Sequence, residues 1–105
     1  MMKVSPISAT IGRMSDLTIA GFQKHISDKY EKHDRARGIP GTWLHFSEEI
    51  GELARALARD DRANLAEEFA DVFAWLCTLA NINDIDLSNA ITKKYLSDKP
   101  PQGHK

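Results

Sequence analysis

The sequence predicts an all-α domain, and three observations carry that prediction. Apolar residues recur at the three- and four-residue spacing of amphipathic helices, and no stretch alternates with a period of two for long. Breaks that contain glycine, proline or aspartate separate the periodic segments. The 105 residues give room for one domain, and 42% apolar with 28% charged residues is a globular composition. We expect a flexible lead-in over 1–14, the helical domain over 15–96 and a tail over 97–105.

The first half of the domain predicts two helices. Ser15 or Asp16 caps a helix that runs to about residue 33, and the segment RGIPG at 37–41 ends it. Pro40 and the two glycines of that segment cannot continue a helix cheaply. Thr42 then caps a second helix over 43–59.

The second half predicts two more helices. Asp60 and Asp61 form a turn, and the third helix begins between residues 61 and 64 and runs to about residue 81. Asn64 and Glu67 have the spacing of a capping box. Asp86 caps a fourth helix that ends at about residue 96.

The apolar positions of the first three helices are the predicted core. In the first helix they are Leu17, Ile19, Phe22, Ile26 and Tyr30. The apolar arc of the second helix contains Trp43, Phe46, Ile50, Leu53, Ala54 and Leu57, and that of the third contains Leu65, Phe69, Val72, Trp75, Leu76 and Leu79.

Composition narrows the function classes. The net charge of −1 argues against a general nucleic-acid binder, which neutralises phosphates with a basic surface. Cys77 is the single cysteine, so one chain forms neither a disulfide framework nor a thiolate zinc site. No apolar run approaches the roughly 20 residues of a membrane span, and the N-terminus lacks a signal-peptide core. We expect a cytoplasmic protein without a nucleic-acid or membrane partner.

Two acidic motifs carry the functional signal: EExxE at 48–52 and EExxD at 67–71. On a helical wheel of the third helix, Glu68 falls inside the apolar arc and Asp71 lies at its edge. Glu49 borders the apolar arc of the second helix, and Glu52 lies further round the same flank. A carboxylate that faces a core without a partner is costly, or takes up a proton.

The short turn makes the second and third helices antiparallel neighbours, so the two pairs of acids face each other. Converging carboxylates repel unless a cation lies among them, and a set of oxygen ligands alone suits Mg²⁺ or Mn²⁺. The alternative for a single ExxE motif is a solvated helix face, with early acids favoured by the helix dipole. A motif on each of two neighbouring helices favours the metal site.

The pair EEIGELARAL and NLAEEFADVFAWLCTLAN resembles the signature of the MazG-type all-α nucleoside triphosphate pyrophosphohydrolases, EExxE followed by ExxD. The resemblance extends over about residues 30–95. It implies a four-helix bundle completed by homodimerisation, or a dimer of dimers. The third helix, apolar around more than half its circumference, also predicts a second copy to cover it. The implied reaction is Mg²⁺-dependent cleavage of a (deoxy)nucleoside triphosphate between the α- and β-phosphates, to the monophosphate and pyrophosphate, in nucleotide-pool house-cleaning.

The resemblance also implies roles for individual residues. Glu49, Glu52, Glu68 and Asp71 match the metal-binding acids of the family, and Glu48 would position or deprotonate the attacking water. For substrate binding, the resemblance implies Lys93 and Lys94 as contacts of the phosphates. Spacing places Trp75 on the acidic stripe as a candidate for stacking on the base, against the alternative that it is a core residue. Trp43 is a comparable candidate, and Asp34 or Arg37 are candidates for polar contacts. Basic residues that often follow the family's lysine are replaced here by SDKPPQGHK.

Two alternatives stay open. The same superfamily contains phosphoribosyl-ATP pyrophosphohydrolases, so the motif predicts the chemistry better than the substrate. A helical interaction module without catalysis would keep the apolar faces, but it gives no reason for Glu68 to point inward.

Overall fold

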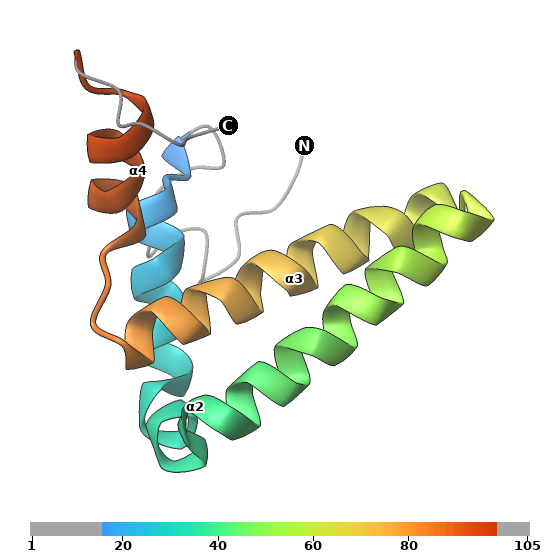
Figure 1. The fold of residues 1–105 in the computed structure, drawn as a ribbon, viewed down its shortest axis with the longest axis horizontal. Coiled ribbons are helices and arrows are strands. Elements are labelled where there is room, and N and C mark those ends of the chain that lie inside the picture. Colours follow the sequence, from blue (N-terminus) through green and yellow to red (C-terminus); the bar gives the residue numbers. More distant parts are fainter. Residues whose placement is uncertain (1–15, 99–105) are drawn as a thin grey trace, which may run out of the picture.

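The computed structural model describes residues 16–98, and every regular element in that range is helical. The helices are α2 (Ile19–Arg59), α3 (Arg62–Ile82) and α4 (Leu87–Tyr95), as Figure 1 shows. The prediction of an all-α fold is confirmed. The expected lead-in over 1–14 and the tail from residue 99 onward lie outside the described residues.

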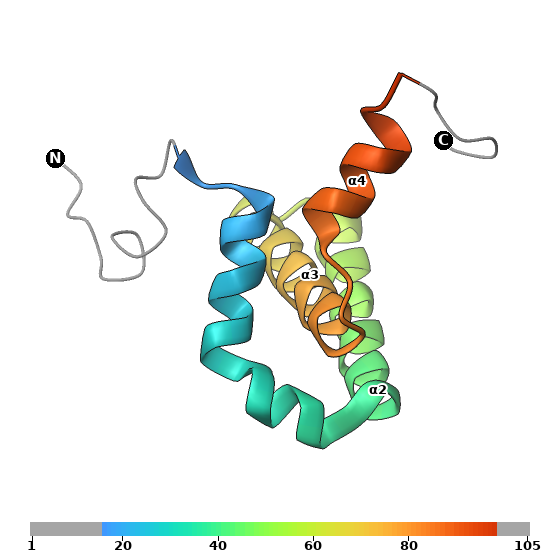
Figure 2. The same cartoon turned by 90° about the vertical axis from the view of Figure 1, so that its left-hand side faces the viewer.

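Helix α2 consists of two helical halves joined at a kink, and the break that the sequence predicted within RGIPG at 37–41 is confirmed. Gly38 alone has non-helical torsions within it (φ 85°, ψ 174°), in a region of the backbone map that is essentially restricted to glycine. Pro40 lies in the first turn after this bend, where its missing N–H costs no hydrogen bond. The helix therefore resumes at once, and the prediction that Thr42 caps a new helix is wrong. Figures 1 and 2 show the change of direction between the two halves.

The helix starts follow side-chain caps, at positions that differ in part from those predicted. Thr18 caps α2, in place of Ser15 or Asp16, and its hydroxyl accepts a 2.9 Å hydrogen bond from the Gly21 N–H. Asp61 caps α3 and accepts from the Asn64 N–H, so the predicted capping box at Asn64 is wrong. Asp86 caps α4 as predicted.

Helix α3 packs against both halves of α2. It runs antiparallel to the second half, which it follows after a tight turn at Asp60 and Asp61 (Figure 1). The ring of Phe73 stacks on Phe22 of the first half, with centroids 5.8 Å apart. The ring of Trp75 stacks on His45 of the second half, at 5.1 Å. The bend in α2 thus wraps the helix around α3.

A buried glutamine joins the ends of all three helices. The Gln23 Nε2 group donates to Asn81 Oδ1 at 3.0 Å and to the Ile85 carbonyl at 2.7 Å. Its Oε1 accepts the backbone N–H of Leu87 at the start of α4, at 3.0 Å. Every polar atom of this amide is paired, so Gln23 fixes α4 beside the first half of α2.

The apolar core of the described chain is small. Its fully buried apolar members are Ile26, Phe46, Ala56, Leu65, Cys77 and Ala80. Burial raises the pKa of the Cys77 thiol to about 11, in keeping with the inert core thiol that was predicted. None of the described helices combines the length and the apolar character needed to cross a membrane.

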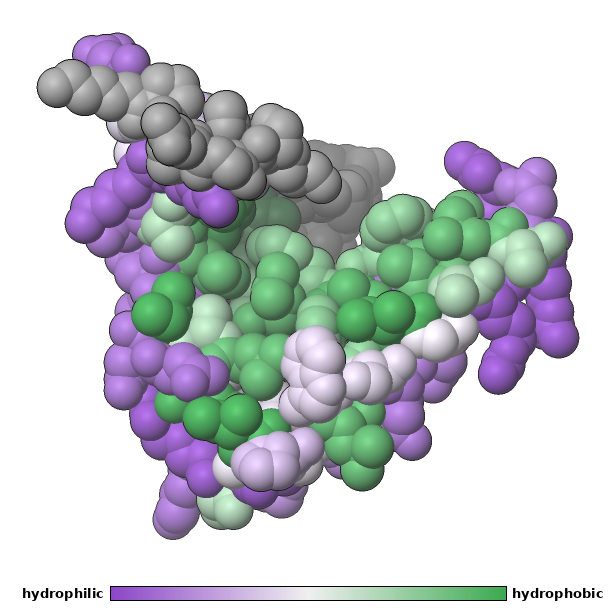
Figure 3. Space-filling model, viewed as in Figure 1, coloured by the Kyte–Doolittle hydropathy of each residue, from purple (hydrophilic) through white to green (hydrophobic). Residues whose placement is uncertain are grey.

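Several predicted core positions are instead exposed on the single chain. Trp43, Ile50 and Leu57, spaced by seven residues on α2, are 56%, 43% and 54% exposed. Phe69 and Leu76, with the same spacing on α3, are 54% and 38% exposed. Figure 3 shows apolar surface along α3 and the adjoining part of α2. Leu17, which precedes α2, and Tyr30 in its first half were also predicted as core and are exposed too. The prediction of these side chains as core is wrong for the isolated chain, because no element within residues 16–98 covers them.

Candidate active site

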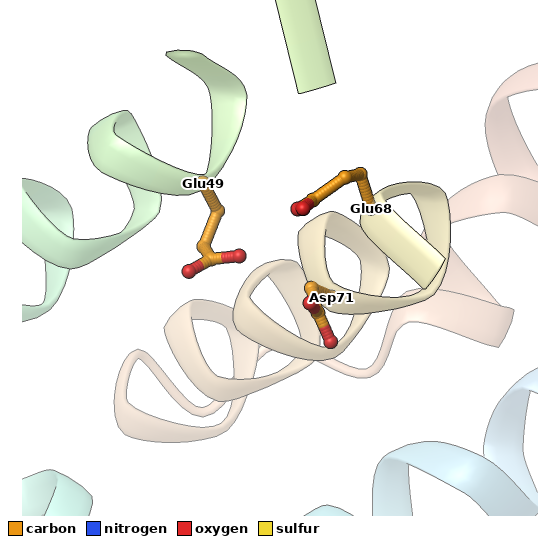
Figure 4. Close-up of side chains that lie close together, drawn as sticks. All are labelled: Glu49, Glu68 and Asp71. Atoms are coloured by element: carbon orange, nitrogen blue, oxygen red, sulfur yellow. The ribbon is translucent and has the colours of Figure 1, made fainter. Parts of the chain in front are cut away.

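Three carboxylates from two helices converge between α2 and α3. Glu68 and Asp71 lie three residues apart on α3 and therefore project from one face, while Glu49 projects from the antiparallel half of α2. Each side chain offers one oxygen atom, and these three oxygens all lie within 4.8 Å of one another. Figure 4 shows the three side chains directed into a common space. The prediction that Glu49 converges with Glu68 and Asp71 agrees with the structure.

Two of these acids are withdrawn from solvent. Glu68 is only 8% exposed, as its place within the apolar arc predicted, and Glu49 is partly buried, while Asp71 is exposed. One oxygen of each buried acid, Glu49 Oε1 and Glu68 Oε1, has no contact with solvent and accepts no hydrogen bond. A buried carboxylate oxygen without a partner is strongly unfavourable. The two atoms therefore require a proton or a cation.

The electrostatics of the cluster follow from this packing. The pKa of Glu49 is raised above its usual value, first by burial and then by the charges of Glu52, Asp71, Glu68 and Glu48. The pKa of Glu68 is also raised, first by burial and then by Glu52, Asp71 and Glu67, against a smaller opposing effect of Arg55. Both carboxylates are thus held in surroundings that disfavour their negative charge.

The donor set fits a hard divalent cation. All three converging ligand atoms are carboxylate oxygens, which Mg²⁺ and Mn²⁺ prefer, and the group contains neither histidine nor cysteine. A divalent ion would supply partners for both orphaned oxygens and would offset the repulsion among the acids. Glu49, Glu68 and Asp71 are therefore the residues that can hold a metal.

The two other predicted acids lie outside this group of three. Glu52 is exposed, yet its charge contributes to the raised pKa of both Glu49 and Glu68, so it lies beside the cluster. Glu48 is exposed, with its Oε1 3.4 Å from His45 Nδ1. A ligand role for Glu52 and a catalytic role for Glu48 stay predictions.

A cavity of about 400 Å³ adjoins the acids. Asp71 forms part of its wall, together with Trp75, Asp34 and Arg37. This volume is within the usual range for small-molecule sites. The first half of α2, up to Arg37, and the middle of α3 supply its walls.

Arg37 is held firmly in the wall of this cavity. Its Nη2 donates to Asp34 Oδ1 at 2.7 Å, and its Nε donates to the hydroxyl of Thr42 at 3.0 Å. Its guanidinium carbon lies 4.9 Å from the centroid of the Trp75 ring, in a cation–π contact. The guanidinium of Arg37 is thus fixed at the cavity wall. Its contact with a substrate stays a prediction.

The two tryptophans have different surroundings. Trp75 lines the cavity, but its ring already has His45 stacked on it and Arg37 beside it, so a base that stacks there must displace one of them. Trp43 is exposed and packs against Phe46, with ring centroids 5.5 Å apart. Base stacking by either ring stays a prediction.

Lys93 and Lys94 occupy the last turn of α4 and are exposed. In Figure 1, α4 lies at the left of the molecule, apart from the antiparallel pair of helices that carries the acids. The Lys94 ammonium lies 5.8 Å from the Tyr95 ring centroid. Phosphate binding by these lysines stays a prediction.

Sequence reasoning missed two residues of this region. Thr42 is fully buried and orients Arg37, whereas the sequence predicted a helix cap there. His45 stacks on Trp75 and approaches Glu48. The sequence carried one signal for these contacts, which is spacing. Arg37 follows Asp34 by three residues, the spacing of an ordinary helical pair. Arg37 precedes Thr42 by five residues, and that contact spans the Gly38 bend.

Comparison with known proteins agrees with this geometry. A search of curated proteins found no significant match. The family model of the MazG nucleotide pyrophosphohydrolase domain matches residues 41–102, more than half of the chain and both acidic motifs. The chain therefore belongs to the MazG nucleotide pyrophosphohydrolase family.

Proposed function

We propose that this protein is a Mg²⁺-dependent pyrophosphohydrolase that cleaves a (deoxy)nucleoside triphosphate between its α- and β-phosphates. The observation that carries the proposal is the pair of buried, unpaired oxygens of Glu49 and Glu68 within a group of three convergent carboxylates. A structural acid would have found a hydrogen-bond partner, whereas a metal ligand keeps its oxygen free. Membership of the family supports the same chemistry.

Glu49, Glu68 and Asp71 would hold the ion, with Glu52 beside them as the candidate fourth acid. When bound, Mg²⁺ neutralises triphosphate charge and stabilises the charge that develops on the leaving pyrophosphate. The cavity that Asp71 borders would receive the nucleoside part of the substrate.

Glu48 is the proposed proton acceptor. Its exposed carboxylate accepts a proton from the attacking water, whose oxygen forms the new bond to the α-phosphorus. The bond from that phosphorus to the oxygen bridging to the β-phosphorus breaks, and the electron pair leaves with pyrophosphate. The products are the nucleoside monophosphate and pyrophosphate, which supports a role in nucleotide-pool house-cleaning in the cytoplasm.

We further propose that the working protein is a homodimer or a dimer of dimers. Trp43, Ile50 and Leu57 form an apolar stripe with a seven-residue repeat on α2, and Phe69 and Leu76 form a second on α3. Stripes with this spacing are typical of helices that pack against another helix. Within residues 16–98 no element covers either stripe, and a second copy offers matching stripes.

The activity is tested with a panel of nucleotides that includes phosphoribosyl-ATP, assayed with Mg²⁺ and with chelator. We expect hydrolysis only with the metal. Glu49→Gln should lower kcat/KM by about 100-fold or more, since even residues behind metal ligands contribute 10- to 100-fold. Glu67→Gln, an equal change of charge on an exposed neighbour in α3, is the matched control and should retain activity. Equal losses in both variants would contradict the assignment of the site.

A further inference from the structure

Asp34 holds the third buried oxygen of the described chain that lacks a partner. The residue is 5% exposed, and its Oδ1 accepts the 2.7 Å hydrogen bond from Arg37. Its Oδ2 has no contact with solvent and accepts no hydrogen bond. The other two such oxygens in residues 16–98 belong to Glu49 and Glu68 of the acidic cluster.

Asp34 also borders the cavity of about 400 Å³ that Asp71 shares with the acidic cluster. A nucleotide with its phosphates at the cluster has its sugar and base in this cavity, and this step rests on the proposed function. The base then lies within the walls that carry Asp34. An unpaired carboxylate oxygen there requires a hydrogen-bond donor from the base.

The geometry limits which donor fits. Arg37 donates to Oδ1, so Oδ2 is the carboxylate oxygen of Asp34 without a partner among the described residues, and Oδ2 is buried. A donor that projects from the ring reaches a recessed atom best, and binding is commonly accompanied by a change of side-chain rotamer. The exocyclic amino groups of cytosine, adenine and guanine project in this way. The ring N–H of uracil or thymine lies between two carbonyl oxygens, which a carboxylate repels.

We propose that Asp34 is a specificity-determining residue that accepts a hydrogen bond from an exocyclic amino group of the base. The preferred substrates then carry cytosine, adenine or guanine, and nucleotides with uracil, thymine or hypoxanthine are disfavoured. A buried site that pairs with a substrate N–H rejects the analogue without it, because its own polar group is left unpaired.

The test uses pairs of substrates of which one member lacks this group: dGTP against dITP, dCTP against dUTP, and dATP against dITP. The first pair differs by the amino group alone, and in the other two a carbonyl replaces the amino group and the adjacent ring nitrogen carries a hydrogen. In at least one pair we expect kcat/KM to favour the amino-bearing base by about 10- to 100-fold, as for a hydrogen bond to a charged acceptor. Asp34→Asn keeps an oxygen for Arg37 and places an amide N–H₂ at the position of Oδ2. In this variant, the ratio of kcat/KM for the amino-bearing base to kcat/KM for its partner should fall to one or below.

Thr42→Val is the matched control, because it removes the other acceptor of Arg37 and leaves the Asp34 carboxylate in place. This variant should lower kcat/KM for both substrates of a pair by the same factor and so preserve their ratio. If Asp34 only orients Arg37, Asp34→Asn will behave in the same way as Thr42→Val, and the proposal is then wrong. A wild-type ratio near one in all three pairs overturns it as well, whether or not the variant folds.

Calorimetric binding of dCMP, dUMP, dAMP, dGMP and dIMP separates this proposal from the proposed function. Selective binding of the amino-bearing monophosphates that Asp34→Asn removes, without hydrolysis of any triphosphate, supports the role of Asp34 and contradicts the activity. Hydrolysis of both members of every pair at equal rates supports the activity and contradicts the role of Asp34. If no monophosphate binds and no triphosphate is cleaved, both are wrong.

Discussion

Removal of one charge from the acidic cluster should stabilise the protein in the absence of metal. Glu49 and Asp71 present oxygens within 4.8 Å of each other, and at an effective dielectric constant of 20 two unit charges at that distance repel by roughly 3 kcal/mol. Asp71 is exposed, so solvent screens part of this repulsion, and about 1 kcal/mol is a reasonable share. We therefore expect Glu49→Gln in chelator to raise the melting temperature by about 4–8 °C.

Added Mg²⁺ should reverse the order of the two melting temperatures, so that wild type becomes more stable than Glu49→Gln. A metal that binds only the folded chain stabilises it by about 1.4 kcal/mol for each tenfold rise in concentration above the dissociation constant. For a domain of this size that is about 6–11 °C per decade in wild type. Glu49→Gln and Glu68→Gln, each of which lacks one candidate ligand, should respond less.

Differential scanning fluorimetry across a Mg²⁺ series, at one protein concentration, measures both effects. Glu67→Gln has the same change in charge at an exposed position of α3 outside the group of three acids. Its charge acts on Glu68 less than those of Glu52 and Asp71, so it should change the melting temperature in chelator less than Glu49→Gln and should respond to Mg²⁺ as wild type does. The reasoning is refuted if Glu49→Gln is destabilised by the same amount in chelator and in Mg²⁺, because Glu49 would then be an ordinary structural partner.

Three further predictions follow from the fold and the electrostatics. Gly38→Ala should lower the free energy of unfolding by about 1–3 kcal/mol, because φ is 85° at Gly38. Gly51→Ala is the control: it lies in a helix, and an added Cβ there would meet no atom within 4 Å. Chemical denaturation should show that Gly51→Ala stabilises the protein by about 0.5–1 kcal/mol. Gln23→Ala should cost about 1–3 kcal/mol by the same measurement, since it leaves buried partners of the amide unpaired. In chelator, the raised pKa values of Glu49 and Glu68 mean that the folded chain binds more protons than the unfolded chain. The stability that these two carboxyl groups contribute when protonated is therefore lost as the pH rises from about 4.5 through the raised pKa values. The melting temperature of wild type minus that of the Glu49→Gln/Glu68→Gln variant should fall over this window, and a constant difference would contradict the shifts.

The acidic cluster could be predicted from the sequence because its geometry is local. A spacing of three residues places Glu68 and Asp71 on one helix face, and a two-residue turn makes the neighbouring helix antiparallel. The period of the apolar residues identified Glu68 as buried before any contact was known. These inferences need only helix geometry and one connection.

The bend in α2 and the cavity beside the cluster could not be predicted in this way. The sequence of Gly38 and Pro40 indicates a break, but only the torsions of Gly38 show that the helix resumes within a residue. The contact of Arg37 with Thr42 spans that bend and depends on its angle. A pattern of apolar residues also does not distinguish a face covered by its own chain from one covered by another copy, which is why exposed Ile50 and Phe69 read as core.

The position of bond cleavage tests the central claim most directly. A nucleoside triphosphate that the protein accepts as a substrate is hydrolysed in ¹⁸O-labelled water with Mg²⁺, and the products are analysed by mass spectrometry. Attack of water at the α-phosphorus predicts one ¹⁸O atom in the nucleoside monophosphate and none in the pyrophosphate. Release of diphosphate and orthophosphate, or label in the pyrophosphate, would contradict the proposed function.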